Sequence, residues 1–143
     1  MKLSRLLERI EYSVVQGSDS IEITELTNDS RKVVPGSVFV CISGAVVDSH
    51  DFIPEVTEKG AIALIVEKDV TAPPEVTVIR VDDTRYALAL ASAAYFGYPA
   101  EQLRVIGITG TKGKTTTTYM VKSILEQVGH KVGLIGTIEA LIG

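Results

Sequence analysis

The chain has 143 residues, of which 45% are hydrophobic and 22% charged, and its net charge is −4. This composition is ordinary for a globular protein and argues against disorder, and the acidic balance gives no basic surface for nucleic acid. The single cysteine excludes a disulfide framework, and no apolar run reaches the roughly 18 residues that span a bilayer. We therefore expect a cytoplasmic monomer that does not insert into a membrane.

The first hundred residues alternate helix and strand patterns, which is typical of an α/β domain. A short helix is predicted at 3–10, where four apolar side chains fall on one face. The other elements predicted here are, in chain order, strands at 21–24 and 37–43, a helix at 54–59, strands at 61–66 and 76–81, and a helix from 84 to about 97. Cys41 lies within an apolar strand, so we expect a buried, reduced thiol there and not a ligand or nucleophile.

A linker at 98–101 precedes a second pattern. An apolar strand is predicted at 105–108, a helix then runs to Val128, and another strand follows at 131–136. Strand, helix and strand in this order form a βαβ unit. We therefore expect an α/β protein with a domain boundary near residue 100. A small α/β domain would occupy 1–100, and the start of a P-loop-type, parallel-sheet ATP-binding domain would occupy 101–143.

The loop before this second helix has the residue types of a phosphate cradle. Gly110 and Gly113 let the backbone curl so that N–H groups point inward, and the helix presents its positive N-terminus. Lys114 would then reach the β- and γ-phosphates of ATP, and the Thr115 hydroxyl would ligate Mg²⁺. The strict pattern has glycine where this chain has Ile108, so the motif is a variant. A turn with a chance Gly-Lys-Thr is the alternative.

Four stretches together resemble the Mur ligases, the ATP-dependent amide-bond synthetases of peptidoglycan building. They are the loop Thr109-Gly110-Thr111-Lys112-Gly113-Lys114-Thr115, the segment 28–40 with its Asn-Asp-Ser-Arg and Pro-Gly-Ser-Val-Phe-Val elements, Gly44 with Asp48-Ser49-His50-Asp51-Phe52, and Gly133-Leu134-Ile135-Gly136-Thr137. Ser49 stands where the family usually has glycine, and Lys112 where asparagine is frequent. The resemblance covers the whole chain, and 133–137 resembles the family member that adds the third residue of the peptide.

The resemblance implies a reaction and its participants. ATP would phosphorylate the carboxylate of UDP-N-acetylmuramoyl-L-Ala-D-Glu, and the amine of a diamino acid, diaminopimelate or lysine, would attack the acyl phosphate to form an amide. Lys114 would be the catalytic residue of this chain, and Thr115 its metal ligand. The residues implied for ATP are Gly110, Thr111, Lys112, Gly113, Lys114, Thr115 and Thr116.

The resemblance also implies a site for the uridine-diphosphate end of the substrate. Asn28 and Ser30 match positions that hold it, and Ala45, Val46 and Val47 occupy the loop that closes over it. Because all three loop residues are apolar here, only their backbone would form polar contacts. Without the resemblance, the segment 29–31 would be interpreted as an Asx or Ser turn.

Other interpretations stay open. The chain is also compatible with the Mur ligase that adds D-Ala-D-Ala, with a UDP-sugar-binding module, and with a nucleotide-binding switch that forms no amide. His50 is expected to hold its loop by a hydrogen bond and not to act as an acid or base. Glu139 is not expected to ligate Mg²⁺. The later parts of the family pattern are absent from these 143 residues, so we expect the chain alone to lack ligase activity.

Overall fold

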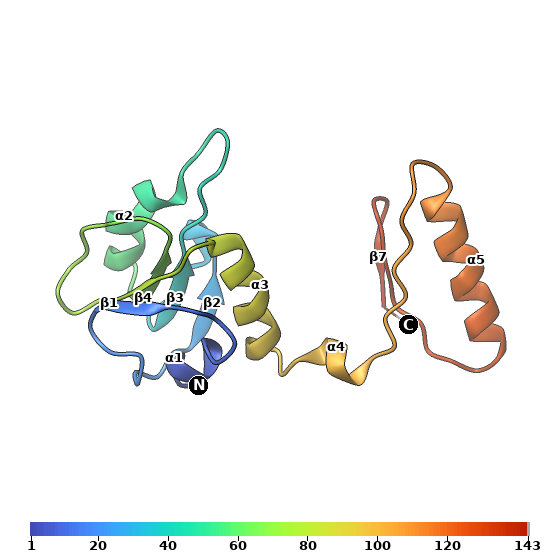
Figure 1. Ribbon diagram of the computed structural model, residues 1–143, viewed down its shortest axis with the longest axis horizontal. Coiled ribbons are helices and arrows are strands. Elements are labelled where there is room, and N and C mark those ends of the chain that lie inside the picture. The colour runs from blue at the N-terminus through green and yellow to red at the C-terminus, as the bar shows by residue number, and fades with distance from the viewer. Residues whose placement is uncertain (143) are drawn as a thin grey trace. The chain divides into compact units, whose positions relative to one another are not determined.

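The computed structural model describes residues 1–142 and divides into two compact units, Met1–Leu103 and a second unit that begins at Arg104. Each unit contains both helices and strands (Figure 1). The expected α/β class is therefore confirmed. None of the helices in this described part is both long enough and apolar enough to cross a bilayer.

The first unit is built on a five-stranded sheet. Its strands are β1 (Ser13–Gln16), β2 (Glu25–Thr27), β3 (Ser37–Val40), β4 (Ala61–Val66) and β5 (Thr77–Arg80). The spatial order is β1-β5-β4-β3-β2, with β1 antiparallel to β5 and all other neighbours parallel. The carboxyl ends of β2 to β5 therefore lie along one edge, where ligands bind in many open α/β sheets.

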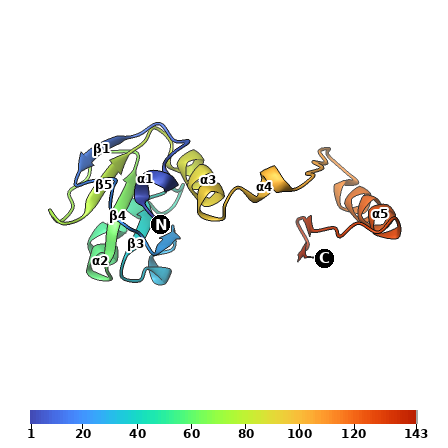
Figure 2. The same ribbon diagram turned by 90° about the horizontal axis from the view of Figure 1, so that it is seen from below.

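Helices cover both faces of this sheet (Figure 1 and Figure 2). On one face, α1 (Leu3–Leu6) and α3 (Thr84–Tyr95) pack against side chains such as Val38. On the other face, α2 (Ile53–Glu58) packs against side chains such as Phe39. Successive side chains of a strand point to opposite faces, so a strand covered on both sides is apolar on both, as β4 and residues 38–40 of β3 are.

Local sequence signals explain where the longer elements begin and end. The Asp83 carboxylate accepts hydrogen bonds from the backbone N–H groups of Arg85 and Tyr86, at 2.8 and 2.9 Å, and so caps α3. Gly60 follows α2 with φ at +101°, and a Cβ there would lie 2.9 Å from the Cα of Pro35. Glycine is therefore the residue that this turn requires.

Two predictions in the first unit need correction, and one strand was missed. The strand expected at 21–24 is displaced to β2, because Ile23 donates its N–H to the Met1 carbonyl at 2.8 Å and so pairs with the N-terminus. Strand β1 was not predicted, since its burial does not alternate and Val15 is 62% exposed. Short 3-10 helices, η1 (Ser30–Lys32) and η2 (Ser49–Phe52), occupy segments expected to be loops.

The linker contains a short helix, α4 (Pro99–Gln102), that is attached to the end of the first unit. Tyr98 precedes it in the left-handed conformation, with φ at +54°, which is uncommon for a residue other than glycine. The Arg9 guanidinium lies 3.9 Å from the centre of the Tyr98 ring and 2.5 Å from a carboxylate oxygen of Glu101. The Tyr98 hydroxyl donates a hydrogen bond to Glu8.

The second unit consists of α5 (Lys114–Gln127) and an antiparallel hairpin of β6 (Leu134–Ile135) and β7 (Ala140–Leu141). The strand predicted at 105–108 is wrong. Within residues 104–142 this segment joins no ladder, and β6 pairs with β7 instead. A strand needs a hydrogen-bonded neighbour, and an apolar run alone does not supply one. The predicted end of the helix is confirmed, because Gly129 follows it with φ at +88°.

Candidate functional site

The loop that leads into α5 has an unusual backbone. Gly110 and Gly113 have φ values of 152° and 77°, in the region that favours glycine. The Gly113 carbonyl accepts the N–H of Thr117 at 2.9 Å, which closes the first turn of α5. The N–H groups ahead of that turn have no acceptor within the helix, so they are available to an anion. The chemistry of this loop therefore fits a phosphate group.

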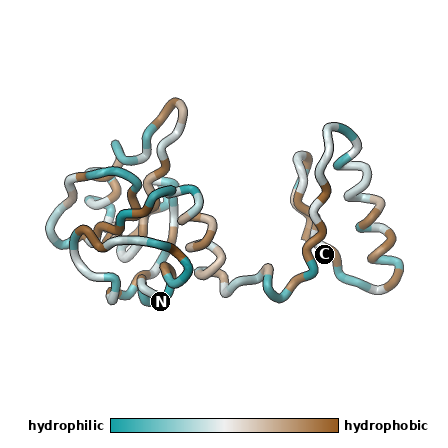
Figure 3. The backbone as a smooth tube through the Cα atoms, viewed as in Figure 1, coloured by the Kyte–Doolittle hydropathy of each residue, from teal (hydrophilic) through white to brown (hydrophobic). Residues whose placement is uncertain are grey.

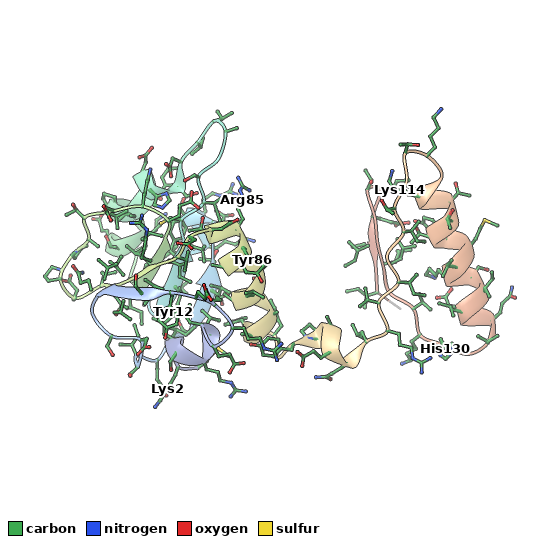
Figure 4. All side chains as sticks on the ribbon, in the orientation of Figure 1. Lys2, Tyr12, Arg85, Tyr86, Lys114 and His130 are labelled. Carbon is green, nitrogen blue, oxygen red and sulfur yellow. The ribbon has the colours of Figure 1, made fainter. Side chains whose placement is uncertain are left out.

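Lys114 is the first residue of α5 and lies at its N-terminal end (Figure 4). Its ammonium group donates a hydrogen bond to the Gly110 carbonyl at 2.5 Å, across the mouth of the loop. The lysine charge is thus held beside the same backbone that would cradle a phosphate. Thr111, Lys112 and Thr116 are exposed along this segment.

A small cavity of about 130 Å³ lies between the start of α5 and the β6–β7 hairpin. Its lining residues are Ile108, Lys114, Thr115, Thr118, Tyr119, Leu134, Ile135, Gly136, Thr137, Ile138 and Glu139. The structure therefore brings Lys114 and Thr115 together with the hairpin, whereas Thr111, Lys112 and Thr116 are not part of this lining. Tyr119 was not singled out by the sequence, and residues 133–137 of the hairpin were named only for their resemblance to the family.

Tyr119 joins the two sides of this cavity, because its hydroxyl donates a hydrogen bond to the Glu139 carboxylate. That bond raises the pKa of Tyr119 above its usual value. The Glu139 carboxylate is therefore engaged by a tyrosine. Residues 1–142 contain no group of three or more His, Cys, Asp or Glu side chains that could hold a metal ion. Thr115, which was predicted to ligate Mg²⁺, lines the cavity, and its metal role stays a prediction.

The second set of predicted residues lies at the carboxyl edge of the first unit. Asn28 follows β2 and lines an open groove of about 510 Å³ between β2 and α3. The other lining residues are Glu25, Leu26, Thr27, Lys32, Val34, Leu88 and Ser92. Ser30 begins η1 and is half-buried on the same turn, but it does not line the groove.

The turn that carries Ser30 is organised by Asp29. The Asp29 side chain accepts the N–H of Arg31 at 3.1 Å, and its two oxygens contact the Arg31 guanidinium at 2.8 Å each. These bonds lower the pKa of Asp29 to about 2. The Asx turn that local sequence predicted is therefore present, and it fixes the backbone between Asn28 and Ser30.

Ala45, Val46 and Val47 lie at the tip of a short hairpin that leaves the sheet after β3 (Figure 1). Ser43 and Asp48 pair as an antiparallel bridge at its base. All three tip residues are exposed, and Val46 is 95% exposed. The tip therefore presents backbone groups and apolar side chains to solvent, at the same edge of the sheet as Asn28.

His50 lies at the base of this hairpin and is 6% exposed. Its Nδ1 lies 2.6 Å from a carboxylate oxygen of Asp48, and its Nε2 faces the backbone N–H of Glu67 at 3.4 Å. The expectation that His50 holds its loop by a hydrogen bond is confirmed. Lys68 also contacts the Asp48 carboxylate. The two residues are 20 positions apart in sequence, so no local pattern reveals this contact.

Cys41 is fully buried, as expected for a thiol in an apolar strand. Burial is the main cause that raises the pKa of its thiol to about 12. Such a thiol carries little of the thiolate form that acts as nucleophile or metal ligand at neutral pH.

The fold and the loop together define an α/β protein with a glycine-rich loop of the phosphate-binding type. A family model described as "Mur ligase family, catalytic domain" matches residues 22–98, and one described as "Mur ligase middle domain" matches residues 108–143. The chain therefore belongs to the Mur ligase family.

Curated relatives carry the name UDP-N-acetylmuramoyl-L-alanyl-D-glutamate--2,6-diaminopimelate ligase. The protein of that name from Clostridium perfringens is 47% identical over 143 residues, and the one from Alkaliphilus metalliredigens is 48% identical over 143 residues. All of this chain is covered in both comparisons, but only 30% and 29% of those proteins. The chain thus spans about 30% of the length of the relatives that it matches.

Solved structures of the family show the same fold. MurF from Acinetobacter baumannii matches with a TM-score of 0.68 and 32% identity, over 95% of this chain and 29% of that one. A MurF ligase from Thermotoga maritima in complex with ADP matches with a TM-score of 0.55 and 30% identity, over 72% of this chain and 23% of that one.

Proposed function

We propose that this chain supplies the first part of an ATP-dependent ligase that adds a diamino acid to UDP-N-acetylmuramoyl-L-Ala-D-Glu. The observation that carries the proposal is the 47% identity, over the whole chain, with a relative named as the diaminopimelate-adding ligase. The proposal places the reaction in the cytoplasm. It does not require the 143 residues alone to turn over substrate.

In this proposal the segment 101–143 holds the triphosphate of ATP. The Gly110–Thr116 backbone would cradle the phosphates, and Lys114 would neutralise charge that develops on the transferred phosphoryl group. Thr115 would hold Mg²⁺, which would supply further charge neutralisation at the phosphates. Support comes from the left-handed glycines, from the ammonium held at the loop mouth, and from the ADP complex of the Thermotoga maritima relative.

The segment 1–100 would recognise the uridine-diphosphate end of the substrate. Asn28, Ser30 and the backbone of the tip residues 45–47 share one edge of the sheet, which supports a common ligand. The tip side chains would add apolar contact only. The substrate that the family reaction needs carries a uridine diphosphate at one end and the carboxylate to be activated at the other.

The named alternative within the family is the ligase that adds D-Ala-D-Ala, because the matched solved structures carry that assignment or the name MurF. Their identity to this chain is 30–32%, whereas the diaminopimelate-adding relatives reach 41–48%. We therefore favour the diamino acid. Because the relatives are named as diaminopimelate ligases, the proposal takes diaminopimelate and not lysine as this diamino acid.

Two titrations of the 143-residue chain test the binding roles, one with Mg·ADP and one with UDP, each followed by calorimetry. We expect both nucleotides to bind, independently of each other. Binding of UDP alone would favour a UDP-sugar-binding module, and binding of ADP alone would favour a nucleotide switch. Absence of both would refute the proposal.

The reaction itself is tested in a chimera in which these 143 residues replace the matching 30% of the Clostridium perfringens relative. We expect phosphate release from ATP with UDP-N-acetylmuramoyl-L-Ala-D-Glu and diaminopimelate, and little release with lysine or D-Ala-D-Ala as the amine. The Lys114→Ala chimera is the matched control for loop-dependent turnover. A folded but inactive parent chimera would count against the proposal.

A further inference from the structure

The hairpin at 43–48 combines an apolar, exposed tip with a polar, partly buried base. At the tip, Val46 is 95% and Val47 55% exposed. At the base, the N–H of Gly44 donates to the Val47 carbonyl at 3.0 Å, and the N–H of Ser49 donates to the Ile42 carbonyl at 3.0 Å. An apolar tip gains nothing from standing in water, so its projection must be maintained by the base.

Asp48 is the centre of that base. One carboxylate oxygen accepts both the His50 backbone N–H at 2.9 Å and the His50 Nδ1–H at 2.6 Å. The other oxygen accepts the Lys68 ammonium. The three donors come from η2 and from the segment after β4, so the carboxylate ties the hairpin to two neighbouring parts of the sheet edge. These contacts hold the pKa of Asp48 well below its usual range, with the Lys68 bond as the largest cause.

The buried ring of His50 links this carboxylate to the sheet. With Nδ1 donating to Asp48, the Nε2 lone pair is free to accept the N–H of Glu67, which follows β4 directly. Arg85, which is labelled in Figure 4, donates from the first turn of α3 to the Ser43 carbonyl at 3.1 Å. The base is thus held by α3 as well.

Gly44 adds a steric condition to the hairpin. A Cβ at this position would lie 2.5 Å from the Val47 carbonyl oxygen, closer than real Cβ contacts. The tight closure therefore depends on glycine at the base, while Ala45, Val46 and Val47 meet no such condition because they are exposed.

We infer that Asp48, His50 and Lys68 are positioning residues that fix the direction of the 45–47 tip for the uridine-diphosphate end of the substrate. The inference rests on the proposed function, which places that end at the tip. Only backbone groups and methyl groups contact the ligand there, so their placement decides affinity. A tip that is ordered before binding loses less conformational entropy when the ligand arrives.

The experiment is calorimetric titration of the 143-residue chain with UDP and, separately, with Mg·ADP. Asp48→Ala and His50→Leu should each weaken UDP about tenfold, and Lys68→Met by about threefold, as expected for lost charged and buried hydrogen bonds. The affinity for ADP, which is assigned to the other unit, should stay within about twofold and serves as the internal control.

Two further variants separate positioning from general stability. His50→Asn places an amide N–H near the position of Nδ1, so it should restore UDP affinity to within about threefold of the parent. Asp51→Asn changes an exposed carboxylate on the same 3-10 helix, whose side chain makes no hydrogen bond within residues 1–142, and should leave UDP affinity unchanged. Amide exchange of Gly44 and Ser49 should accelerate in Asp48→Ala without ligand.

The possible results are distinct. A parent chain that binds no UDP overturns the proposed function, and with it this assignment. A parent that binds UDP while folded Asp48→Ala, His50→Leu and Lys68→Met bind it equally well overturns the positioning role alone. Weakened UDP binding that His50→Asn fails to restore, with ADP binding lost in parallel, shows a general loss of structure and also overturns it.

Discussion

The two units of this chain bury their apolar side chains to different extents. In the first unit, Phe39, Leu64 and Ile79 are completely buried on the two faces of one sheet. In residues 104–142, Leu134 is the only buried apolar side chain, and Met120 and Ile124 are each 61% exposed. Apolar residues nevertheless recur along α5 and the hairpin (Figure 3).

This difference means that the buried core lies in the first unit, whereas the phosphate loop lies in the second. A sheet covered on both faces excludes water from its strands and is stabilised mainly by that burial. The phosphate loop takes its shape from two glycines and one helix end, which are local features. Substitutions in the core of the first unit should therefore change the free energy of unfolding, and those in the phosphate loop should change the affinity for Mg·ADP.

The largest expected effect is on the core of the first unit. Phe39→Ala removes a completely buried ring and should lower the free energy of unfolding by about 3–5 kcal/mol. Ile124→Ala, on the exposed face of α5, is the matched control and should change it by less than about 0.5 kcal/mol. Urea unfolding followed by far-UV circular dichroism measures both. Equal losses would remove the contrast between the units.

The next largest effect is expected on the affinity for Mg·ADP. Lys114→Ala should weaken Mg·ADP binding about 10- to 100-fold, because a charged partner of the phosphates is lost. Lys122→Ala is the control, since that lysine lies farther along α5 and pairs with Glu126 at 2.6 Å. Calorimetry gives both dissociation constants, and urea unfolding should be unchanged in both variants. Unaltered ADP binding by Lys114→Ala would argue against a phosphate role for the loop.

A smaller effect is expected at the start of α3. Asp83→Ala removes the acceptor of two backbone N–H groups and should cost about 1 kcal/mol of stability. Asp82→Ala, one residue earlier and exposed, should be close to neutral. The comparison by urea midpoint shows how much of the first unit's stability comes from a helix cap and not from its core. Identical midpoints for the two variants would contradict the capping role.

The smallest effect concerns a surface charge. Arg31→Ala removes the main cause that lowers the pKa of Asp29, so that pKa should rise from about 2 toward 3.8. A carboxylate whose folded pKa is depressed stabilises the fold above its unfolded pKa, and this contribution is lost as the pH falls toward 2. The free energy of unfolding of the variant should therefore change less across that acidic range. Carbon-13 NMR titration of the Asp29 carboxyl gives the value, and an unmoved pKa would rule out the Arg31 contact.

Sequence patterns were sufficient where structure is decided locally. The strand at 61–66, the start of a helix at 84 and the end of a helix near Val128 were each predicted from local sequence, and the structure confirms them. The run at 105–108 is equally apolar but joins no ladder, because pairing depends on a neighbour elsewhere in the chain. Strand β1 has no alternation to reveal it.

The residues of the candidate sites also fall into those that local sequence reveals and those that only the fold brings together. Gly110, Gly113 and Lys114 were recognisable because their chemistry lies within a few adjacent residues. The contact between Lys68 and Asp48 was not, because the fold brings together residues 20 positions apart. Tyr119 and Glu139 meet across a similar separation. Their residue types gave no indication of their partners.

The attachment of α4 to the first unit depends on one side chain, Arg9. The Arg9 guanidinium is stacked on Tyr98 and bonded to Glu101, so the path of the backbone is fixed by the first unit's own side chains as far as Gln102. The residues that follow, from Leu103 to the phosphate loop, form neither helix nor strand.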